Sequence, residues 1–365
     1  MGNTRSVISC PIFVVIAGSL CSTTAIEIKQ NIIDFKFEHK NLGILSTLRV
    51  GHNEKDMQSG QPKWFLDYIL VRNEITGQCY RFNCCRWFGK GVDDGSLERL
   101  LVAEKLPQVD PDADILPQNG YVDRHIKGYS RSRTPPRTRS PSTGRSDSAN
   151  LKSSLFLAYA SNLGEILTGN HSGTRLTEIQ QLLGEAVNAI VKHFYNGVEA
   201  RSELTQLLCA PDKGLVSVMV SVFLYGRQDS IWSTRFFRQQ FPWDYVEKVF
   251  IWFYDLLRME DSKQLTQEQR ALIIHACRLV RRISSNSSLG KDGKFQLFII
   301  TAIRCSDHVL SGLLPLMAWT PITAQLYEEL SFLRTPHYLN YLSKLLNSLN
   351  EYNFDLEKSL TYGID

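Results

Sequence analysis

Two segments rich in glycine and lysine contain the residue types that bind phosphate. They are Gly89-Lys90-Gly91 and Gly290-Lys291-Asp292-Gly293-Lys294. Neither has the Gly-x-x-x-x-Gly-Lys-Ser/Thr spacing with which backbone amides enclose the phosphates of a nucleotide. Nucleotide hydrolysis is therefore not supported. We expect the second segment to cap the start of a helix instead, with Lys291 and Lys294 available to a partner.

Adjacent carboxylates raise the question of a metal site. Asp93-Asp94 lies between Gly89 and Gly95, in a stretch that is typical of a surface turn because glycine adopts positive φ and aspartate bonds its own backbone. Two carboxylates without further oxygen ligands make a weak calcium site, so we favour the turn and keep calcium as the alternative. The eight histidines are scattered, and neither Cys-x-x-Cys nor His-Glu-x-x-His occurs, so zinc is not expected and no cofactor is predicted.

The sequence has no motif for nucleophilic catalysis. No serine lies in a Gly-x-Ser-x-Gly elbow, and no cysteine has a local signature of a nucleophile. The eight cysteines show no paired spacing except Cys84-Cys85, whose side chains point to opposite faces if the segment is a strand. We therefore expect reduced, mostly buried thiols, as in a cytosolic protein, and no enzymatic activity.

Four arginines form the best candidate for a binding surface. Arg270, Arg278, Arg281 and Arg282 fall on one side of a predicted helix whose other side carries an apolar stripe. One interpretation is a solvated helix face, since cations near a helix C-terminus suit the helix dipole. The other is a contact for an acidic partner surface or for anionic headgroups, because guanidinium groups pair carboxylates and phosphates bidentately.

The first third of the chain predicts antiparallel sheet. Trp64 to Val71 is rich in aromatic and β-branched residues, Asn73 to Gly77 carries turn residues, and Gln78 to Phe82 is extended again, so a hairpin is expected. Alternation in Ile33-x-Phe35-x-Phe37 and the extended segment Leu42 to Val50 predict further strands.

From Leu176 onward the apolar spacing predicts helices and no sheet. Thr266 with Gln269 forms a capping-box pattern, and Thr320-Pro321 combines a cap with a proline in the first turn. These signals and the apolar periodicity predict helices over Leu176–Phe194, Pro242–Met259, the segment after Thr266, Phe295–Leu314, Ile322–Leu333 and Leu339–Leu349. An all-α bundle follows.

The N-terminal 30 residues leave two interpretations open. Arg5 precedes an apolar run from Val7 to Cys21, and small residues end at Ala25, which is the pattern of a secretory signal. The run is short for a membrane span, which takes roughly 20 apolar residues. We favour a buried strand or an atypical start. The alternative is a secreted or membrane-anchored lipid-binding protein that uses this apolar segment.

The middle of the chain is a linker by composition. Between residues 107 and 150, Pro, Asp, Ser and Arg replace apolar residues and no periodicity survives. The simplest interpretation is a solvated spacer. A phosphate on Thr134 or Ser140 would instead cancel local positive charge and loosen a contact with an anionic membrane. An RNA-binding arginine/serine tract is disfavoured because no RNA-binding module lies beside it. Residues 151–175 contain a possible inserted helix.

The hairpin and the turn after it resemble a known family. The order Asn73-Glu-Ile-Thr-Gly77, Tyr80-x-Phe82, Arg86-Trp87, Asp93-Asp94-Gly95 and Glu98-Arg99 resembles the second half of a PLAT domain, a β-sandwich. The segment Gly89-Lys-Gly-Val-Asp-Asp-Gly-Ser-Leu-Glu-Arg99 is similar to part of the PLAT domain of the Rab-interacting DENN-domain proteins. In that family the C-terminal half contains a RUN, a PLAT and a second RUN domain, in that order. This resemblance implies a membrane-facing role for exposed residues of the sandwich, with Trp64, Phe88 and Lys90 as candidates. For Trp64 and Phe88 we favour the alternative, packing in the core.

The C-terminal half resembles the second RUN domain of the same family. The similar segments are Gly184–Phe194, Gly290–Phe295, Pro321–Ala324 and Leu360–Asp365. The resemblance implies a Rab-type small GTPase or a trafficking protein as partner. The family's exchange module and its first RUN domain have no counterpart in this sequence. The PLAT strands expected before Asn31 are not recognisable, which predicts a sandwich incomplete at its N-terminal edge.

The sequence therefore predicts an α+β multidomain protein. The predicted parts are an atypical apolar N-terminus (1–30), a PLAT-like antiparallel β-sandwich (31–106), a basic linker (107–150), a possible inserted helix (151–175) and an all-α RUN-like bundle (176–365). A net charge of +4 over 365 residues is too small to imply nucleic acid. We expect a non-catalytic adaptor in membrane trafficking, cytoplasmic and peripheral on Golgi or endosomal membranes. The oligomeric state is left open.

Overall fold

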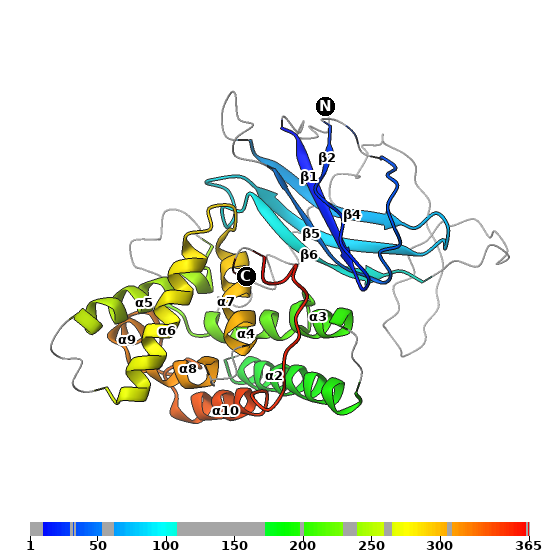
Figure 1. Ribbon diagram of the computed structural model, residues 1–365. Helices are drawn as coiled ribbons and strands as arrows, with labels where there is room; N and C mark the ends of the chain where they lie inside the picture. Colours follow the sequence, from blue (N-terminus) through cyan, green and yellow to red (C-terminus); the bar gives the residue numbers. More distant parts are fainter. Residues whose placement is uncertain are drawn as a thin grey trace, which may run out of the picture. The chain divides into compact units, whose positions relative to one another are not determined.

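The computed structural model describes residues 10–29, 32, 34–52, 62–107, 172–197, 201–228, 239–258, 265–304, 309–362 and 364. Strands come first along the chain and helices follow, and both groups fall in one compact unit (Figure 1). The predicted fold class, an antiparallel β-structure followed by an all-α region, is confirmed, and the strands of the predicted sandwich form one six-stranded sheet. The candidate phosphorylation sites Thr134 and Ser140, with the rest of the predicted linker after Pro107, lie outside the described residues.

The sheet has six strands, and every neighbouring pair is antiparallel. Its order is β2-β1-β3-β6-β5-β4. Strands β3 and β6 therefore lie at the centre, with β1 and β2 on one side and β5 and β4 on the other. The strands are β1 (Ile12–Gly18), β2 (Ile26–Ile28), β3 (Leu45–His52), β4 (Trp64–Arg72), β5 (Cys79–Phe88) and β6 (Glu98–Lys105). The predicted hairpin is confirmed, with Gly77 at φ +70° in its turn.

The apolar segment near the N-terminus contains strand β1, as the buried-strand interpretation predicted. β1 lies between β2 and β3, and Val14 and Ile16 are buried. The sheet thus includes two strands that precede residue 31. The strand predicted from the alternation at Phe35 and Phe37 is wrong: no strand is assigned there, and both rings are more than one-third exposed. Among the described residues, no helix is both long and apolar enough to cross a membrane.

Trp64 and Phe88 form the centre of the sheet core. They face each other across β4 and β5, and their rings stack with centroids 4.0 Å apart. Both side chains are buried, at 1% and 0% exposure, so their predicted membrane-facing role is wrong. The physical reason is the pairing itself, because it turns both rings to the same inner face of the sheet. The Trp64 indole Nε1 also donates to Nδ1 of His52 at 3.0 Å.

A register irregularity lies beside this core. Asp67 of β4 lies opposite both Cys84 and Cys85 of β5, which is the pattern of a β-bulge. Cys85 adopts φ +51°, and its Sγ contacts Asp67. The seven described cysteines are free thiols.

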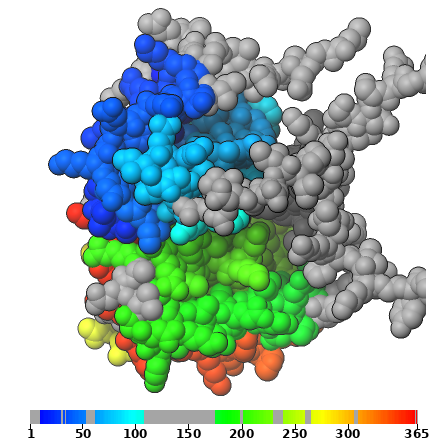
Figure 2. Space-filling model, turned by 90° about the vertical axis from the view of Figure 1, so that its right-hand side faces the viewer, coloured from blue at the N-terminus to red at the C-terminus, as the bar shows by residue number. Residues whose placement is uncertain are grey.

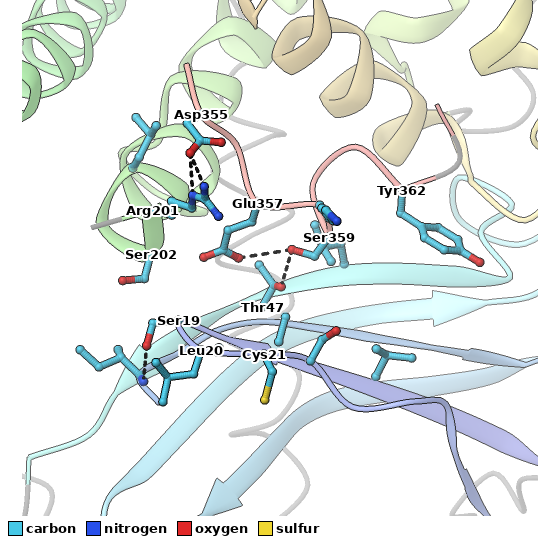
Figure 3. A pocket seen from close by; sticks show the side chains of 18 of the residues that line it. Ser19, Leu20, Cys21, Thr47, Arg201, Ser202, Asp355, Glu357, Ser359 and Tyr362 are labelled. Atoms are coloured by element: carbon cyan, nitrogen blue, oxygen red, sulfur yellow. Dashed lines mark hydrogen bonds and ion pairs between the residues drawn. The ribbon is translucent and has the colours of Figure 1, made fainter. Parts of the chain in front are cut away.

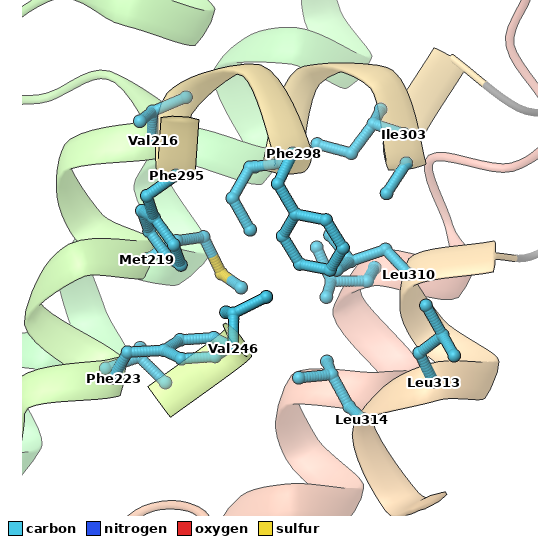
Figure 4. Close-up of a cluster of buried hydrophobic side chains, with 14 of the residues drawn as sticks. Val216, Met219, Phe223, Val246, Phe295, Phe298, Ile303, Leu310, Leu313 and Leu314 are labelled. Atoms are coloured by element: carbon cyan, nitrogen blue, oxygen red, sulfur yellow. The ribbon is translucent and has the colours of Figure 1, made fainter. Parts of the chain in front are cut away.

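Nine helices are described after residue 171, and together they bury a separate apolar core (Figure 4). Phe295 and Phe298 lie at its centre, with Met219 and Leu314 beside them. The helices are α2 (Ser172–Tyr195), α3 (Arg201–Cys209), α4 (Leu215–Leu224), α5 (Pro242–Arg258), α6 (Gln267–Ser284), α7 (Lys291–Arg304), α8 (Val309–Trp319), α9 (Pro321–Leu326) and α10 (Pro336–Asn347).

Local capping signals placed several helix starts correctly. The Thr266 hydroxyl accepts from the Gln269 amide while the Gln269 side chain accepts from the Thr266 amide, so the predicted capping box is confirmed. Thr320 caps α9, with Pro321 in its first turn. Helix ends were predicted less well. The predicted helix 295–314 contains parts of two helices, α7 and α8, and the predicted helix 322–333 ends at Leu326.

The stacked pair predicts a large energetic effect of one residue. Phe88→Ala is expected to lower the free energy of unfolding by about 3–5 kcal/mol, because it removes a fully buried ring and leaves a cavity. Trp87→Ala is the matched control, since the neighbouring Trp87 ring is 39% exposed and its loss should cost clearly less. Urea unfolding followed by circular dichroism measures both. Equal losses would contradict this assignment of the core.

The buried histidine predicts a pH dependence. Burial lowers the pKa of His52 below its ordinary value of 6.5, so the unfolded chain binds the proton more tightly than the folded one. The free energy of unfolding should fall as the pH drops through about 6.5 toward the lowered pKa. His52→Asn keeps an acceptor for Trp64 and removes the titration. Its unfolding free energy, measured between pH 7.5 and 5.5, should depend less on pH, and an unchanged dependence would rule out His52 as the cause.

Candidate protein-binding site

The four predicted arginines lie on the outer side of α6. Arg270, Arg278, Arg281 and Arg282 are exposed, while the apolar stripe that includes Ile273, Ala276 and Ile283 packs into the helical core. Arg278, Arg281 and Arg282 make no ion pair with any other described residue. Guanidinium groups held on a rigid helix without internal partners are able to pair carboxylates of another protein.

The two lysines predicted to be available to a partner are used inside the molecule. Lys291 Nζ lies 2.7 Å from Asp244 Oδ1 on α5 and 5.2 Å from the centre of the Phe241 ring. Lys294 Nζ donates to the backbone oxygen of Ser284 at 3.3 Å. Both lysines thus have contacts within the molecule, because the first turn of α7 lies against neighbouring elements that the sequence does not reveal. Lys90, the third predicted membrane-facing residue, is half-buried.

The Asp93-Asp94 turn holds two ion pairs. Arg86 Nε donates to Asp93 Oδ2 at 2.6 Å, and the Arg99 guanidinium donates to both carboxylate oxygens of Asp94. Asp93 adopts φ +51° to close the turn. The predicted turn is confirmed, but Asp94 is only 5% exposed, so this part of it is not at the surface. Since arginines already occupy both carboxylates, the geometry fits a structural turn and not a calcium loop.

Asp94 also caps the N-terminus of α7. Its Oδ2 accepts from the Asp292 amide at 3.2 Å, and its backbone oxygen accepts from the Lys291 amide at 3.1 Å. The Gly290 amide donates to Ser96 Oγ at 3.1 Å. The first amides of a helix have no partner within the helix, and a carboxylate there also suits the positive end of the helix dipole. A residue of the sheet thus performs the capping that a local side chain performs in α6.

A buried salt bridge completes this joint. Arg86 reaches from Asp93 to Asp292 Oδ2 at 2.6 Å, so one guanidinium connects the sheet to the first turn of α7. Burial acts to raise the pKa of Asp93, but the hydrogen bond and charge of Arg86 outweigh it and hold that pKa below its ordinary value. For Asp292 burial dominates and raises the pKa despite Arg86. Three carboxylates, those of Asp93, Asp94 and Asp292, share the two guanidinium groups of Arg86 and Arg99. Asp292 receives the least compensation, which is why its pKa is raised.

The backbone joins the same two parts. The amides of Leu97 and Glu98 donate to the Ser288 oxygen at 2.9 and 3.2 Å, and Glu98 forms an isolated bridge with Leu289. Ser288 Oγ donates to Glu98 Oε1 at 2.7 Å. The joint therefore combines backbone, helix-cap and ionic contacts. We define it by residues of β5, of β6 and of the loop between them, together with the segment 288–292. The residues are Arg86, Asp93, Asp94, Ser96, Glu98 and Arg99.

A cleft of about 1360 Å³ lies elsewhere between strand and helix residues (Figure 3). The C-terminal segment forms one wall: Glu357 accepts from Ser46 at 2.6 Å, and Thr47 donates to Ser359 at 2.9 Å. Arg201 of α3 pairs with Asp355 across it. In this wall Asp355 is thus ion-paired, while Glu357 accepts hydrogen bonds from hydroxyl groups. In the space-filling view, blue and cyan atoms of the sheet lie directly against green atoms of the helices (Figure 2).

Sequence reasoning missed both the joint and the cleft. Their residues come from segments that are about 200 to 310 positions apart along the chain, and neither set forms a motif. The segments Gly89–Arg99 and Gly290–Lys294 stood out separately, because both are rich in glycine and charge. Nothing in the sequence indicated that each is the other's partner. Among the described residues, no group of three or more His, Cys, Asp or Glu side chains is placed to hold a metal ion.

Comparison with known proteins identifies both halves at the level of domains. A PLAT/LH2 domain model matches residues 17–102, and a RUN domain model matches residues 180–360. The mouse and human proteins named lipoxygenase homology domain-containing protein 1 are each 37% identical over 78 residues, which is 21% of this chain. The chain spans only 4% of the length of those relatives.

Solved lipoxygenase structures also resemble part of the chain. One is a crystal structure of a lipoxygenase variant, and another is an anaerobic crystal structure of such a variant in complex with arachidonate. Each is 15% identical, covers 28% of this chain and 15% of the other, and has a TM-score of 0.23. At that score the likeness supports no argument. The presence of a PLAT/LH2 domain and a RUN domain rests on the domain models.

The joint predicts opposite effects at two glycines of the same segment. A Cβ on Gly290 would lie 2.6 Å from Asp94 Cγ and closer still to Ser96 Oγ, whereas a Cβ on Gly293 meets nothing nearer than Leu289 Cδ2 at 3.4 Å. Gly290→Ala should therefore lower the free energy of unfolding by about 1–3 kcal/mol. Gly293→Ala lies within α7 and should raise it by about 0.5–1 kcal/mol. Urea unfolding measures both, and a Gly290→Ala chain as stable as the original would contradict the close approach.

Proposed function

We propose that the chain is a non-catalytic adaptor in membrane trafficking. Its RUN domain binds a Rab-type small GTPase or another trafficking protein, and its PLAT/LH2 domain associates with a membrane. The presence of both domains supports an adaptor or trafficking role, and a RUN domain suggests a small GTPase as partner in general. The single observation that carries the proposal is that Arg278, Arg281 and Arg282 are exposed on α6 and make no ion pair with any other residue that the structure describes.

The membrane part of the proposal is supported by other residues than those first expected. Trp64 and Phe88 are buried, but the outer side of the β4–β5 hairpin exposes several large apolar side chains. These are Tyr68, Leu70, Ile75 and Trp87, with exposures from 39% to 96%. Arg81 lies over the Tyr68 ring at 4.4 Å. Aromatic side chains beside arginines suit the interface between lipid headgroups and acyl chains.

The wider assignment follows the resemblance of the sequence. We place the chain with the Rab-interacting DENN-domain proteins, in the RUN–PLAT–RUN group. Guanine-nucleotide exchange would then be carried by a module that has no counterpart in these 365 residues. We expect cytoplasmic protein that is peripheral on Golgi or endosomal membranes.

A binding assay with purified small GTPases tests the central claim. The full chain, immobilised through a C-terminal tag, is exposed to a panel of Rab-type GTPases, each loaded with GDP or with a non-hydrolysable GTP analogue. We expect at least one GTPase to be retained in only one nucleotide state. Binding should weaken between 0.1 and about 0.5 M salt, because exposed charges are screened beyond the Debye length of about 10 Å or less. If every GTPase is lost in both states, the proposed partner is wrong.

A further inference from the structure

Helices α5 and α6 form an antiparallel pair whose register is set by one contact. The helices are consecutive in the chain and pack side by side (Figure 1). Ser284 Oγ, in the last turn of α6, donates to Glu247 Oε1, in the second turn of α5, at 3.2 Å. Glu247 and Ser284 therefore mark the sides on which the two helices face each other near the protein surface.

Each helix carries a row of residues in line with this contact. On α5 the row runs Glu247, Ile251, Tyr254 and Arg258, at spacings of four, three and four. On α6 it runs back from Ser284 through Arg281, Cys277 and Ile274 to Arg270, at spacings of three and four. Residues at these spacings lie on one side of a helix. Both rows therefore start from the Glu247–Ser284 contact.

The register places apolar groups beside cations along the two rows. Counted from the Glu247–Ser284 contact, Ile251 is one turn along α5 and Arg281 is one turn back along α6, and Tyr254 and Cys277 follow one turn further on each helix. Ile251 is 62% exposed and Tyr254 51% exposed. The Arg258 guanidinium lies 5.8 Å from the centre of the Tyr254 ring. We call Ile251, Tyr254, Arg258, Ile274 and Arg281 the α5–α6 ridge.

Composition separates the ridge from an ordinary solvated surface. Single exposed apolar residues are normal, but here an isoleucine and a tyrosine are exposed one turn apart and have arginines on both sides. Tyrosine and arginine are enriched at the energetic centres of protein interfaces. The one carboxylate in the rows, Glu247, already accepts a hydrogen bond from Ser284, and the exposed Asp255 is rotated by about 100° from Tyr254.

We infer that the α5–α6 ridge is the part of the RUN domain that contacts the GTPase, and that the matching surface of the GTPase is an apolar patch bordered by aspartate or glutamate. This inference rests on the proposed function and refines it. Of the four arginines considered from the sequence, Arg281 belongs to the ridge. Arg278 lies four residues after Ile274 and three before Arg281, so it borders the ridge. Arg282 follows Arg281 directly, so it is rotated by about 100° from Arg281 and does not enter the contact.

Two adjacent arginines provide the test. Arg281→Glu and Arg282→Glu make the same change of charge on exposed neighbouring positions, but only Arg281 lies on the ridge. With the GTPase that binds the unchanged chain most tightly, in its preferred nucleotide state, we expect Arg281→Glu and Tyr254→Ala each to raise the Kd at least about tenfold. Arg282→Glu should change the Kd less than about threefold. Titration calorimetry or surface plasmon resonance on the full chain measures these constants.

The outcomes distinguish the two claims. Urea unfolding of each variant shows whether it folds, and all three positions are exposed, so midpoints close to that of the unchanged chain are expected. If the unchanged chain binds a GTPase but Arg281→Glu and Tyr254→Ala bind as well as Arg282→Glu, the ridge is wrong and the proposed function stands. If Arg282→Glu weakens binding as much as Arg281→Glu, the contact lies on the other side of α6. If no GTPase binds the unchanged chain, both claims are wrong.

Discussion

The carboxylate of Asp94 is the group on which the arrangement of the two cores depends. It accepts from Arg99 in the sheet and from the first turn of α7 at the same time, while Arg86 links Asp93 to Asp292. A buried carboxylate is stable only when its oxygens are hydrogen-bonded and its charge is compensated, and removing one partner of such a pair typically costs about 3–5 kcal/mol. On the sheet side Arg86 and Arg99 already compensate Asp93 and Asp94, whereas the first amides of α7 find their acceptors on Asp94 and Ser96.

This dependence connects the joint to the surface proposed for partner binding. Helix α7 packs against both α5 and α6, and Lys291 in its first turn pairs with Asp244 at the start of α5. The joint thus positions the helix on which the α5–α6 pair rests. The ion pair of Arg86 with Asp292 and the hydrogen bond from the Asp292 amide to Asp94 hold the sheet against the first turn of α7. These contacts fix the position of the sheet relative to the helices. Arg86 and Arg99 are both engaged in the joint, whereas Arg278, Arg281 and Arg282 on the outer side of α6 make no ion pair with another described residue.

The features that were predicted correctly depend on interactions between residues close together in the sequence. The β4–β5 hairpin followed from its turn residues, and the start of α6 followed from Thr266 and Gln269, because both depend on contacts within a few residues. The alternation at Phe35 and Phe37 suggested a strand, yet no neighbouring strand pairs with that segment in the described part of the chain. Lys291 and Lys294 were taken as free because their partners, Asp244 and the Ser284 oxygen, lie on other elements.

The sequence by itself determined the succession of sheet and helix, the domain types and the row of arginines on α6. These features follow from apolar periodicity, turn residues and short sequence motifs, each of which involves residues close together in the chain. Only the tertiary structure decided that Trp64 and Phe88 stack inside the sheet, and that the turn at Asp93 and Asp94 caps a helix about 200 residues later. It also decided that Ser284, one turn from Arg281, contacts Glu247, one turn from Ile251. The reason is that burial and charge pairing depend on which surfaces meet, and distant segments meet only when the whole chain has folded.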